Sequence, residues 1–346
     1  MNQLIDNAYF QDIMNQPQAV RATLDGLQND HALLRIPDAL ARGKLRRIVL
    51  TGMGSSFHAL YPLFLTLANH GFAVQLIETA ELVHYARGLI TPATLLIAVS
   101  QSGRSAEILR LLEVNAASAP LIAVTNSPES PLAQAADEVV LTRAGEEFSV
   151  SCKTYVTALA ALAWLGDALT GQSPQGTLAA LEEAAAGMAR YLAAWPEHLR
   201  VLSARLQPVR FLNIVGRGPS LAAVGTASLI IKESARFPAL GLSSAAFRHG
   251  PLEMIDERHF TLVYAGLSRT RPLNLKLAED VRRIGGGAEV VDRSQGAGAF
   301  ALPPVPDAAL PLMEILPAQM ISLALARLHG HEPGVFTHAS KVTMAE

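Results

Sequence analysis

The sequence is poor in cysteine, in aromatic residues and in charge. Cys152 is the only cysteine among 346 residues, so the chain can form neither an internal disulfide nor a zinc site built on cysteines, and this usage fits a reducing compartment. Charged residues make up 17% of the chain, and the formal net charge is −2. This balance gives no sign of a basic surface, and we therefore expect no nucleic-acid partner.

Long apolar runs are also missing, and so is a secretory leader. No positively charged segment precedes an apolar one at the N-terminus, and no apolar run without a charge or a breaker comes near the roughly 18 residues of a membrane span. Apolar residues are present in shorter pieces, because half of the chain is hydrophobic and its length suffices for two domains. We predict a folded cytoplasmic protein with no membrane span and no membrane partner.

Apolar strands alternate with helical segments along most of the chain. The expected strands cover 46–51, 73–77, 94–100, 120–125 and 138–141 and, after two long helices at 151–169 and 177–206, they cover 211–215, 260–265 and 288–292. Strands with no polar face that alternate with helices are typical of parallel sheets covered on both sides. The predicted fold class is therefore α/β.

The first strand of each group runs into the same pattern of small residues. Gly52-x-Gly54-x-Ser56 recurs further along the chain as Gly216-x-Gly218-x-Ser220. Two tandem, doubly wound, flavodoxin-like domains with helices on both faces of each parallel sheet account for this repeat. The predicted divisions are an N-terminal helical arm (1–40), a first domain (41–175), a linker helix (176–205), a second domain (206–330) and a C-terminal tail (331–346).

Hydroxyl side chains gather where the first and third strands are expected to end. The polar residues there are Ser55 and Ser56 and, after the third strand, Ser100, Gln101, Ser102 and Ser105. The ends of parallel strands share one edge of the sheet, where ligands bind and helix N-termini present free N–H groups to anions. Neutral donors of this kind suit a phosphate monoester, although serine at a helix start is also a routine N-cap.

A dinucleotide site would use some of the same residues. Gly52-x-Gly54 follows a strand, and Glu78 ends the next strand, where an acid would meet a ribose. The third position of that fingerprint needs Gly or Ala for close helix packing, but it is Phe57 in the first copy and Leu221 in the second. The phosphate-ester interpretation is therefore favoured.

Three ionisable residues outside the serine clusters are candidates for acid/base chemistry. Glu233 lies in the last turn of its expected helix, where the helix dipole disfavours a carboxylate and should raise its pKa. His249 precedes Gly250-Pro251, which fixes a turn, and Lys341 lies in an extended C-terminal arm. Taken singly, such residues are more often a solvated helix end, a structural histidine and a frayed tail.

The whole chain resembles the sugar isomerase (SIS) family, and most of all the tandem-SIS isomerase half of glucosamine-6-phosphate synthase and stand-alone relatives that deaminate or isomerise amino-sugar phosphates. The matching segments are IMNQPQAVRATL around Gln16-Pro17, GSSFHA (54–59), SQSGRSAEIL (100–109), TNSPESPLA (125–133), SVSCKTY (149–155), GRGPS (216–220), IKESARFPALGLSSAAFRHGPLEMI (231–255) and SKVTMAE (340–346). Their order and spacing make the resemblance specific.

The resemblance implies a role for each candidate residue. It assigns the sugar phosphate to Ser56, Ser100, Gln101, Ser102 and Ser105, and sugar contacts to Ser149, Ser151 and Ser340. Glu233 falls on the base that moves a proton between C1 and C2, His249 on the ring-opening histidine and Lys341 on the lysine at the open-chain carbonyl. In the family this histidine typically comes from a neighbouring subunit, which implies a homodimer, and the chemistry demands no metal or other cofactor.

The chain departs from the synthase pattern in two respects. Ile230 stands where the synthase carries a second lysine, and no N-terminal cysteine nucleophile is present, so we expect no glutaminase activity. The predicted function is isomerisation and deamination of an amino-sugar 6-phosphate resembling glucosamine 6-phosphate. The alternatives are a deglycase for fructosamine-type 6-phosphates and a non-catalytic phosphosugar sensor, although residues 1–40 are too few for a convincing DNA-binding domain.

Overall fold

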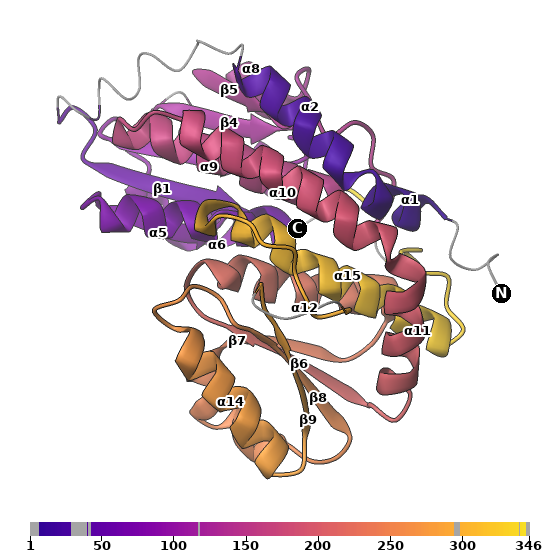
Figure 1. The fold of residues 1–346 in the computed structure, drawn as a ribbon. Coiled ribbons are helices and arrows are strands. Elements are labelled where there is room, and N and C mark those ends of the chain that lie inside the picture. Colours follow the sequence, from indigo (N-terminus) through magenta and orange to yellow (C-terminus); the bar gives the residue numbers. More distant parts are fainter. Residues whose placement is uncertain are drawn as a thin grey trace. The chain divides into compact units, whose positions relative to one another are not determined.

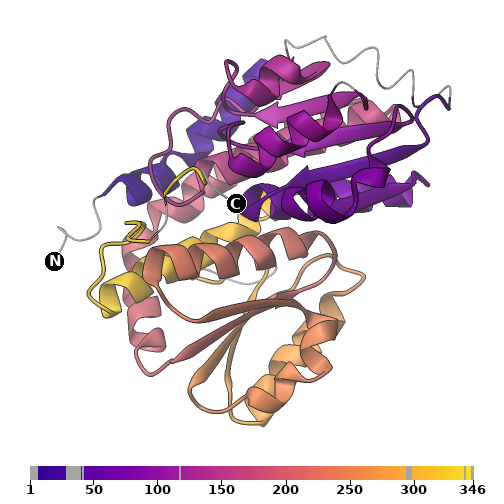
Figure 2. The same ribbon diagram turned by 180° about the vertical axis from the view of Figure 1, so that it is seen from behind.

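A computed structural model describes residues 7–28, 40, 43–116, 118–293, 298–338 and 340–343 (Figures 1 and 2). The chain folds into two compact units, each assembled from separate stretches. The first-sheet unit comprises 18–146, 153–182 and 338–346, and the second-sheet unit comprises 1–17, 147–152 and 183–337. The domain ranges drawn from the sequence stay a prediction, and part of the expected N-terminal arm (1–6 and 29–39) lies outside the described residues.

The first sheet is parallel throughout and has the strand order β2-β1-β3-β4-β5. All five strands were expected from their apolar runs, and their bounds are β1 (Arg47–Gly52), β2 (Val74–Glu78), β3 (Thr94–Val99), β4 (Leu121–Thr125) and β5 (Glu138–Leu141). β1 pairs with β3 so that Gly52 lies opposite Val99. The segments that follow these two strands therefore start side by side at the carboxyl edge of the sheet.

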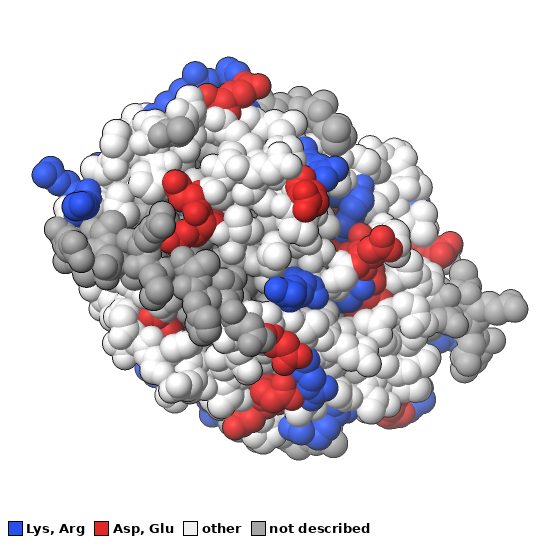
Figure 3. Space-filling view, turned by 90° about the horizontal axis from the view of Figure 1, so that it is seen from above, with Lys and Arg blue, Asp and Glu red and all other residues white. Residues whose placement is uncertain are grey.

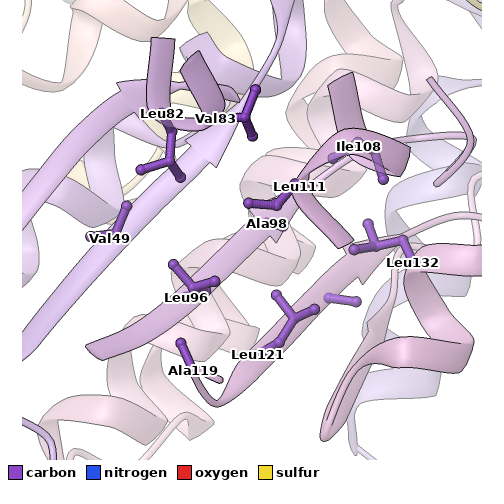
Figure 4. Packing of buried hydrophobic residues seen from close by; sticks show 11 residues of the cluster. Val49, Leu82, Val83, Leu96, Ala98, Ile108, Leu111, Ala119, Leu121 and Leu132 are labelled. Carbon is purple, nitrogen blue, oxygen red and sulfur yellow. The ribbon is translucent and has the colours of Figure 1, made fainter. Parts of the chain in front are cut away.

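Helices of the same unit cover both faces of the first sheet. Val49 and Leu96 pack against helices α6 and α7 in the layer shown in Figure 4, whereas Ile48 and Leu95, which are equally buried, point to the opposite face. On that side α9 contacts α4, α5 and β4. The helices of this unit are α2 (Gln16–Gln28, which starts at the division), α4 (Gly54–Ala59), α5 (Tyr61–Asn69), α6 (Thr79–Tyr85), α7 (Ala106–Asn115), α8 (Pro131–Ala135) and α9 (Lys153–Thr170), with a short 3-10 turn η1 (Arg87–Leu89).

The second sheet is also parallel, in the order β7-β6-β8-β9. Its strands are β6 (Phe211–Gly216), β7 (Ala239–Ser243), β8 (His259–Tyr264) and β9 (Gly287–Val291). Its helices are α1 (Ala8–Met14), α11 (Trp195–Leu206), α12 (Leu221–Ala235), α13 (Ser244–Arg248), α14 (Arg271–Arg283) and α15 (Leu310–Leu328), with 3-10 turns η2 (Gly218–Ser220), η3 (Pro251–Met254) and η4 (Asp307–Ala309). The α/β class with parallel sheets is thus confirmed.

The structure corrects two local expectations. The single helix expected over 177–206 is two helices, α10 (Gln175–Ala193) and α11, because Pro196 occupies the first turn of a new helix that starts after Ala194. The strand β7 was not expected, since Ala239–Ser243 is short and partly exposed. A Cβ atom on Gly241 would lie 2.8 Å from the Val224 carbonyl oxygen, so this glycine lets α12 approach β7 closely.

Among the residues that the structure describes, one segment is long and apolar enough to span a membrane by length and composition. It runs over Asp307–Leu328, and an 18-residue stretch of it has a mean hydropathy of 1.6 and is 94% buried inside the protein. A core helix of a folded unit has these properties. On the face drawn in Figure 3, basic and acidic side chains are interspersed, and most of the remaining described surface carries no charge.

Candidate functional site

The turn from β1 into α4 begins the serine-rich edge of the first sheet. Gly54 has a φ of +53°, and a Cβ atom on Gly52 would lie 3.0 Å from the Val99 carbonyl oxygen of the neighbouring strand. Both glycines are therefore required by the backbone. The hydroxyl of Ser55 is buried and has no hydrogen-bond partner among the residues that the structure describes, and Ser56 follows it at half-buried depth.

The loop from β3 into α7 is held in shape by its own polar groups. The Ser100 hydroxyl accepts a hydrogen bond from Gly103 N (3.1 Å), and the Ser102 hydroxyl accepts one from Arg104 N (3.3 Å). Gly103 has a φ of +60°. The carbonyl of Gln101 accepts three bonds at the start of the loop after β4, from Asn126 N, Thr125 Oγ1 and Ser127 Oγ.

The end of this loop leads into the start of α7. Ser105 is the N-cap residue of α7, but its side chain makes no capping hydrogen bond. Because β1 and β3 are neighbours, Ser56 and the loop 100–105 belong to one edge of one sheet. Hydroxyls, backbone N–H groups and the N-terminus of a ten-residue helix at such an edge can hold a phosphate without a dedicated cation.

Glu233 lies in the last turn of α12, as expected from the sequence, and its side chain is half-buried. The helix ends after Ala235, and Arg236 takes the left-handed conformation with a φ of +51°. The expected rise in the pKa of Glu233 stays a prediction. The hydroxyl of the neighbouring Ser234 donates to the Ile230 carbonyl at 2.6 Å, within the same helix.

Tyr9 is a residue beside Glu233 that the sequence reasoning missed. It comes from α1, is fully buried, and its hydroxyl is 3.0 Å from the Ser322 hydroxyl. Burial raises the pKa of the Tyr9 hydroxyl, the nearby Cys152 raises it further, hydrogen bonds with Ser322 and Ser234 lower it, and Glu233 adds a smaller rise. Tyr9 is therefore a neutral hydrogen-bonding group close to the expected base. The sequence signal was weak, because an aromatic residue in a short helix usually indicates only packing.

His249 occupies the position that its sequence context predicts. It follows α13 as the C-cap, with its N–H donating to the Ala246 carbonyl (3.0 Å), and Gly250 has a φ of +133°, as a glycine before Pro251 permits. The imidazole is exposed in the second-sheet unit. Arg248, the last residue of α13, pairs with Asp280 at 2.7 Å, which joins this turn to helix α14.

The three serines expected to contact the sugar differ in their surroundings. Ser149 is buried, and its hydroxyl donates to the carbonyl of Gly334 at 2.5 Å. Ser151 is half-buried. The third, Ser340, is exposed, and its hydroxyl donates to the Val342 carbonyl of the same arm (2.7 Å). Their contacts with a sugar stay a prediction.

Three buried groups next to these serines have the atoms of a metal site. Ligand atoms of Asp12, Glu147 and Cys152 lie within 4.8 Å of one another, and Cys152 N donates to a carboxylate oxygen of Glu147 at 2.9 Å. Two carboxylates and a thiolate could hold a cation such as Zn²⁺. Among the described residues, this is the one group of three or more such side chains.

Lys341 lies in the first-sheet unit and is half-buried. Two residues later, the Thr343 carbonyl accepts a hydrogen bond from Ala106 N (3.1 Å), the first residue of α7. Within this unit the terminal arm therefore docks directly beside the serine loop. The other two ionisable candidates, Glu233 and His249, belong to the second-sheet unit.

The second sheet has a turn of the same shape but of different chemistry. Gly218, like Gly54, has a positive φ (+58°), but the Ser220 hydroxyl donates to Glu314 at 2.8 Å. Glu314 is 1% exposed, and burial raises its pKa to about 8, against smaller lowering effects of the Ser220 hydroxyl and the Arg293 charge. The Ser220 hydroxyl is therefore already hydrogen-bonded to a buried acid.

A comparison with known families identifies the first sheet and its helices. Residues 43–166 match the model of the SIS domain. This range contains both serine-rich segments, and it ends within α9. The chain thus contains an SIS domain.

Curated proteins similar to the chain are isomerising glutamine–fructose-6-phosphate aminotransferases. The protein of Pyrococcus horikoshii is 28% identical over 338 residues, which cover 94% of this chain and 55% of that protein. The protein of Methanothermobacter thermautotrophicus is 28% identical over 351 residues, which cover 99% of this chain and 58% of that protein. The chain is homologous to their isomerase half and spans about half their length.

Solved structures share the fold over nearly the whole chain. The C-terminal domain of glucosamine-fructose-6-phosphate aminotransferase from Francisella tularensis aligns with a TM-score of 0.78 at 20% identity, covering 94% of this chain and 97% of that one. Glucosamine-6-phosphate deaminase from Thermotoga maritima aligns with a TM-score of 0.78 at 17% identity, covering 98% and 100%. At these identities the likeness is one of fold.

Proposed function

We propose that the protein is a phosphosugar isomerase that deaminates an amino-sugar 6-phosphate resembling glucosamine 6-phosphate. The observation that carries the proposal is the pair of serine-rich segments at the ends of β1 and β3, one of them leading into the N-terminus of α7, where the side chain of the N-cap Ser105 makes no capping bond. Such an edge suits a phosphate monoester bound by neutral donors. Its position within the SIS domain and the homology to isomerase halves support the same substrate class.

In this proposal the phosphate anchors the substrate, and separate residues act on the sugar. The phosphate contacts are Ser56, Ser100, Gln101, Ser102 and Ser105, and the sugar contacts are Ser149, Ser151 and Ser340. Anchoring the non-reacting end of a substrate holds its carbonyl end in place for proton transfer. The name of the Thermotoga maritima relative, a glucosamine-6-phosphate deaminase, fits this substrate.

The reaction moves a proton from C2 to C1 and consumes one water. His249 protonates the ring oxygen as the ring opens and the C1 hydroxyl gives up its proton. The ammonium of Lys341 then donates a proton to the C1 carbonyl oxygen as Glu233 removes the proton from C2, which gives an enolamine. Glu233 returns the proton to C1, which leaves an iminium at C2, and Lys341 recovers its proton when the amine leaves. Water adds to this carbon, ammonia leaves, and the product is a ketose 6-phosphate. No step needs a metal or an organic cofactor.

The same proposal covers the organisation of the chain. The second sheet would be a second SIS domain, since the Gly-x-Gly-x-Ser turn and its positive φ recur there. The proposal also includes a homodimer in which the exposed His249 acts on the substrate of the neighbouring subunit. It further includes a cytoplasmic location and the lack of glutaminase activity. Size-exclusion chromatography with light scattering would test the dimer.

The test of the activity is direct. Incubation with glucosamine 6-phosphate should release ammonia and a ketose 6-phosphate in equal amounts. Glu233→Gln should reduce kcat by about 10²- to 10⁴-fold while the affinity for the sugar phosphate is kept, because only the proton carrier is lost. Glu257→Gln, at an exposed position on the second-sheet unit, is the matched control and should leave kcat unchanged.

Two other outcomes would replace the proposal. Turnover of a fructosamine-type 6-phosphate, with none of glucosamine 6-phosphate, would identify a deglycase. Tight binding of sugar phosphates without turnover of any of them would identify a sensor, for which Glu233→Gln has no activity to remove.

A further inference from the structure

The chain segment that leaves α15 is held by its backbone at three successive residues. Within the second-sheet unit, the Asn7 side chain donates to the Pro333 carbonyl (2.7 Å), Gly334 N donates to the Ser234 carbonyl (3.3 Å), and the Arg236 guanidinium donates to the Val335 carbonyl (3.3 Å). These bonds come from the N-cap of α1 and from the end of α12. Because the bonds fix main-chain atoms, they set the path of the segment.

A fourth bond comes from a residue expected to bind the sugar. The Ser149 hydroxyl donates to the Gly334 carbonyl at 2.5 Å, and Ser149 is 6% exposed. A hydroxyl has a single proton to donate. Once that proton is given to Gly334, the side chain of Ser149 can only accept a hydrogen bond from a ligand.

Gly334 is required at this point for two independent reasons. Its φ of +79° is one that side chains rarely adopt, and a Cβ atom there would lie 2.3 Å from the Ser149 hydroxyl and 2.6 Å from Tyr9 Cβ. Both neighbours are buried, and the Tyr9 contact is made by the rigid base of its side chain. Any larger residue would have to lift the segment off its seat.

The far end of the same arm is docked in the first-sheet unit. Ala106 N donates to the Thr343 carbonyl (3.1 Å), and Lys341 lies two residues before this bond. Lys341 follows Gly334 by seven residues, so it can lie no further from the seated start than about 25 Å, the reach of a fully extended chain of that length. The fixed start at 333–335 therefore limits how far Lys341 can lie from it.

We propose that Ser149 and Gly334 are positioning residues for Lys341, and that they act by seating the start of the C-terminal arm. The role of Lys341 in turnover rests on the proposed function, whereas the seating of the arm does not. Ser149 thus holds the main chain at Gly334, in addition to or in place of its expected contact with the sugar. Tyr9 contributes the buried surface on which Gly334 rests.

The experiment compares three variants of the full chain without any ligand. Gly334→Ala and Ser149→Ala disrupt the contact between Gly334 and Ser149 that seats the arm. Gly330→Ala is the matched control, because Gly330 also has a positive φ (+68°) but a Cβ atom there would meet nothing within 4 Å. Amide hydrogen exchange of 336–343 should accelerate about tenfold or more in the first two variants, as expected for the loss of one buried hydrogen bond, with strands β6 and β8 unchanged. The labelling rate of Lys341 by an amine reagent should rise with it.

The kinetics then separate positioning from folding. With glucosamine 6-phosphate, the Gly334→Ala protein should lose kcat about tenfold or more and keep KM within a few-fold, since the serines that hold the phosphate and the proposed sugar contacts are unchanged. Ser149→Ala should show at least the same loss of kcat, and its KM also reports the proposed sugar contact. The proposed seating of the arm would be refuted if hydrogen exchange and Lys341 labelling were unchanged in the Gly334→Ala protein. It would also be refuted if hydrogen exchange accelerated equally in the Gly330→Ala protein. A released arm with normal kcat would overturn the positioning role. Wild-type protein without turnover would refute the proposed function alone, and the exchange comparison would still decide the seat.

Discussion

Replacing Glu314 by glutamine should remove most of the decline in stability between pH 5 and pH 8. Glu314 lies in α15, is 1% exposed, and burial raises its pKa from an ordinary 4.5 to about 8. The folded protein therefore holds a proton on this group that the unfolded chain has released. Stability contributed by this group is complete below pH 4.5 and is lost as the pH rises through 8.

The size of the effect follows from the shift. One pKa unit corresponds to about 1.4 kcal/mol, so a rise from 4.5 to about 8 lowers the free energy of unfolding by about 3 kcal/mol between pH 5 and pH 8. In the Glu314→Gln protein the amide oxygen can still accept the Ser220 hydroxyl, so this bond is kept. The new NH₂ group replaces an oxygen without a partner among the described residues and costs about 1–3 kcal/mol at every pH if it too stays unpaired.

The assay is urea unfolding of both proteins at pH 5, 6, 7 and 8. The difference in free energy, variant minus wild type, should rise by about 3 kcal/mol from pH 5 to pH 8, and a constant amide penalty cannot produce this slope. Infrared difference spectra should show a protonated carboxyl band at neutral pH in wild type that the variant lacks. Parallel stability curves, together with no such band, would refute the buried neutral acid.

Two further substitutions test the packing of the second-sheet unit. Gly241→Ala should destabilise the protein by about 1–3 kcal/mol because its Cβ atom would lie 2.8 Å from the Val224 carbonyl oxygen. Gly176→Ala is the control, because Gly176 lies in a helix with nothing within 4 Å of an added Cβ atom, and it should be neutral or slightly stabilising. Thermal unfolding of the two variants measures the difference, and equal unfolding temperatures would contradict the close contact. Gln16 and Gln319 are both fully buried and exchange two amide hydrogen bonds of 2.9 Å. Gln319→Ala should therefore lower the free energy of unfolding by about 2–4 kcal/mol. A decrease below about 0.5 kcal/mol in urea unfolding would mean that the pair contributes little to stability.

The sequence predicted those parts of the fold that depend on local patterns. The central strands β3 and β4 of the first sheet are almost entirely apolar, and Gly54 and Gly218 mark turns that need a positive φ, so both features could be located from the residue types. β7 was missed because a five-residue edge strand with a central glycine has no distinctive pattern. Its position is fixed by pairing with β6, which is a long-range interaction.

The contacts around the candidate residues were harder to predict for the same reason. Ser149 and Gly334 are 185 residues apart in the chain, and a glycine has no side chain to announce a contact. Tyr9 approaches Glu233 only because α1 is part of the second-sheet unit, which the sequence alone placed in a separate arm. Glu314 is a single acid in the apolar segment LPLMEILPAQM, a pattern that indicates a buried acid with a raised pKa but that was not used in the sequence analysis.

The most direct test of the proposed chemistry is the incorporation of solvent deuterium. In D₂O, the wild-type protein should transfer deuterium from solvent to C1 of the ketose product formed from glucosamine 6-phosphate, as followed by proton NMR, because Glu233 exchanges its proton before returning it. The Glu233→Gln protein should bind the same sugar phosphate and incorporate none. Binding by wild type with neither deuterium incorporation nor product would contradict the account.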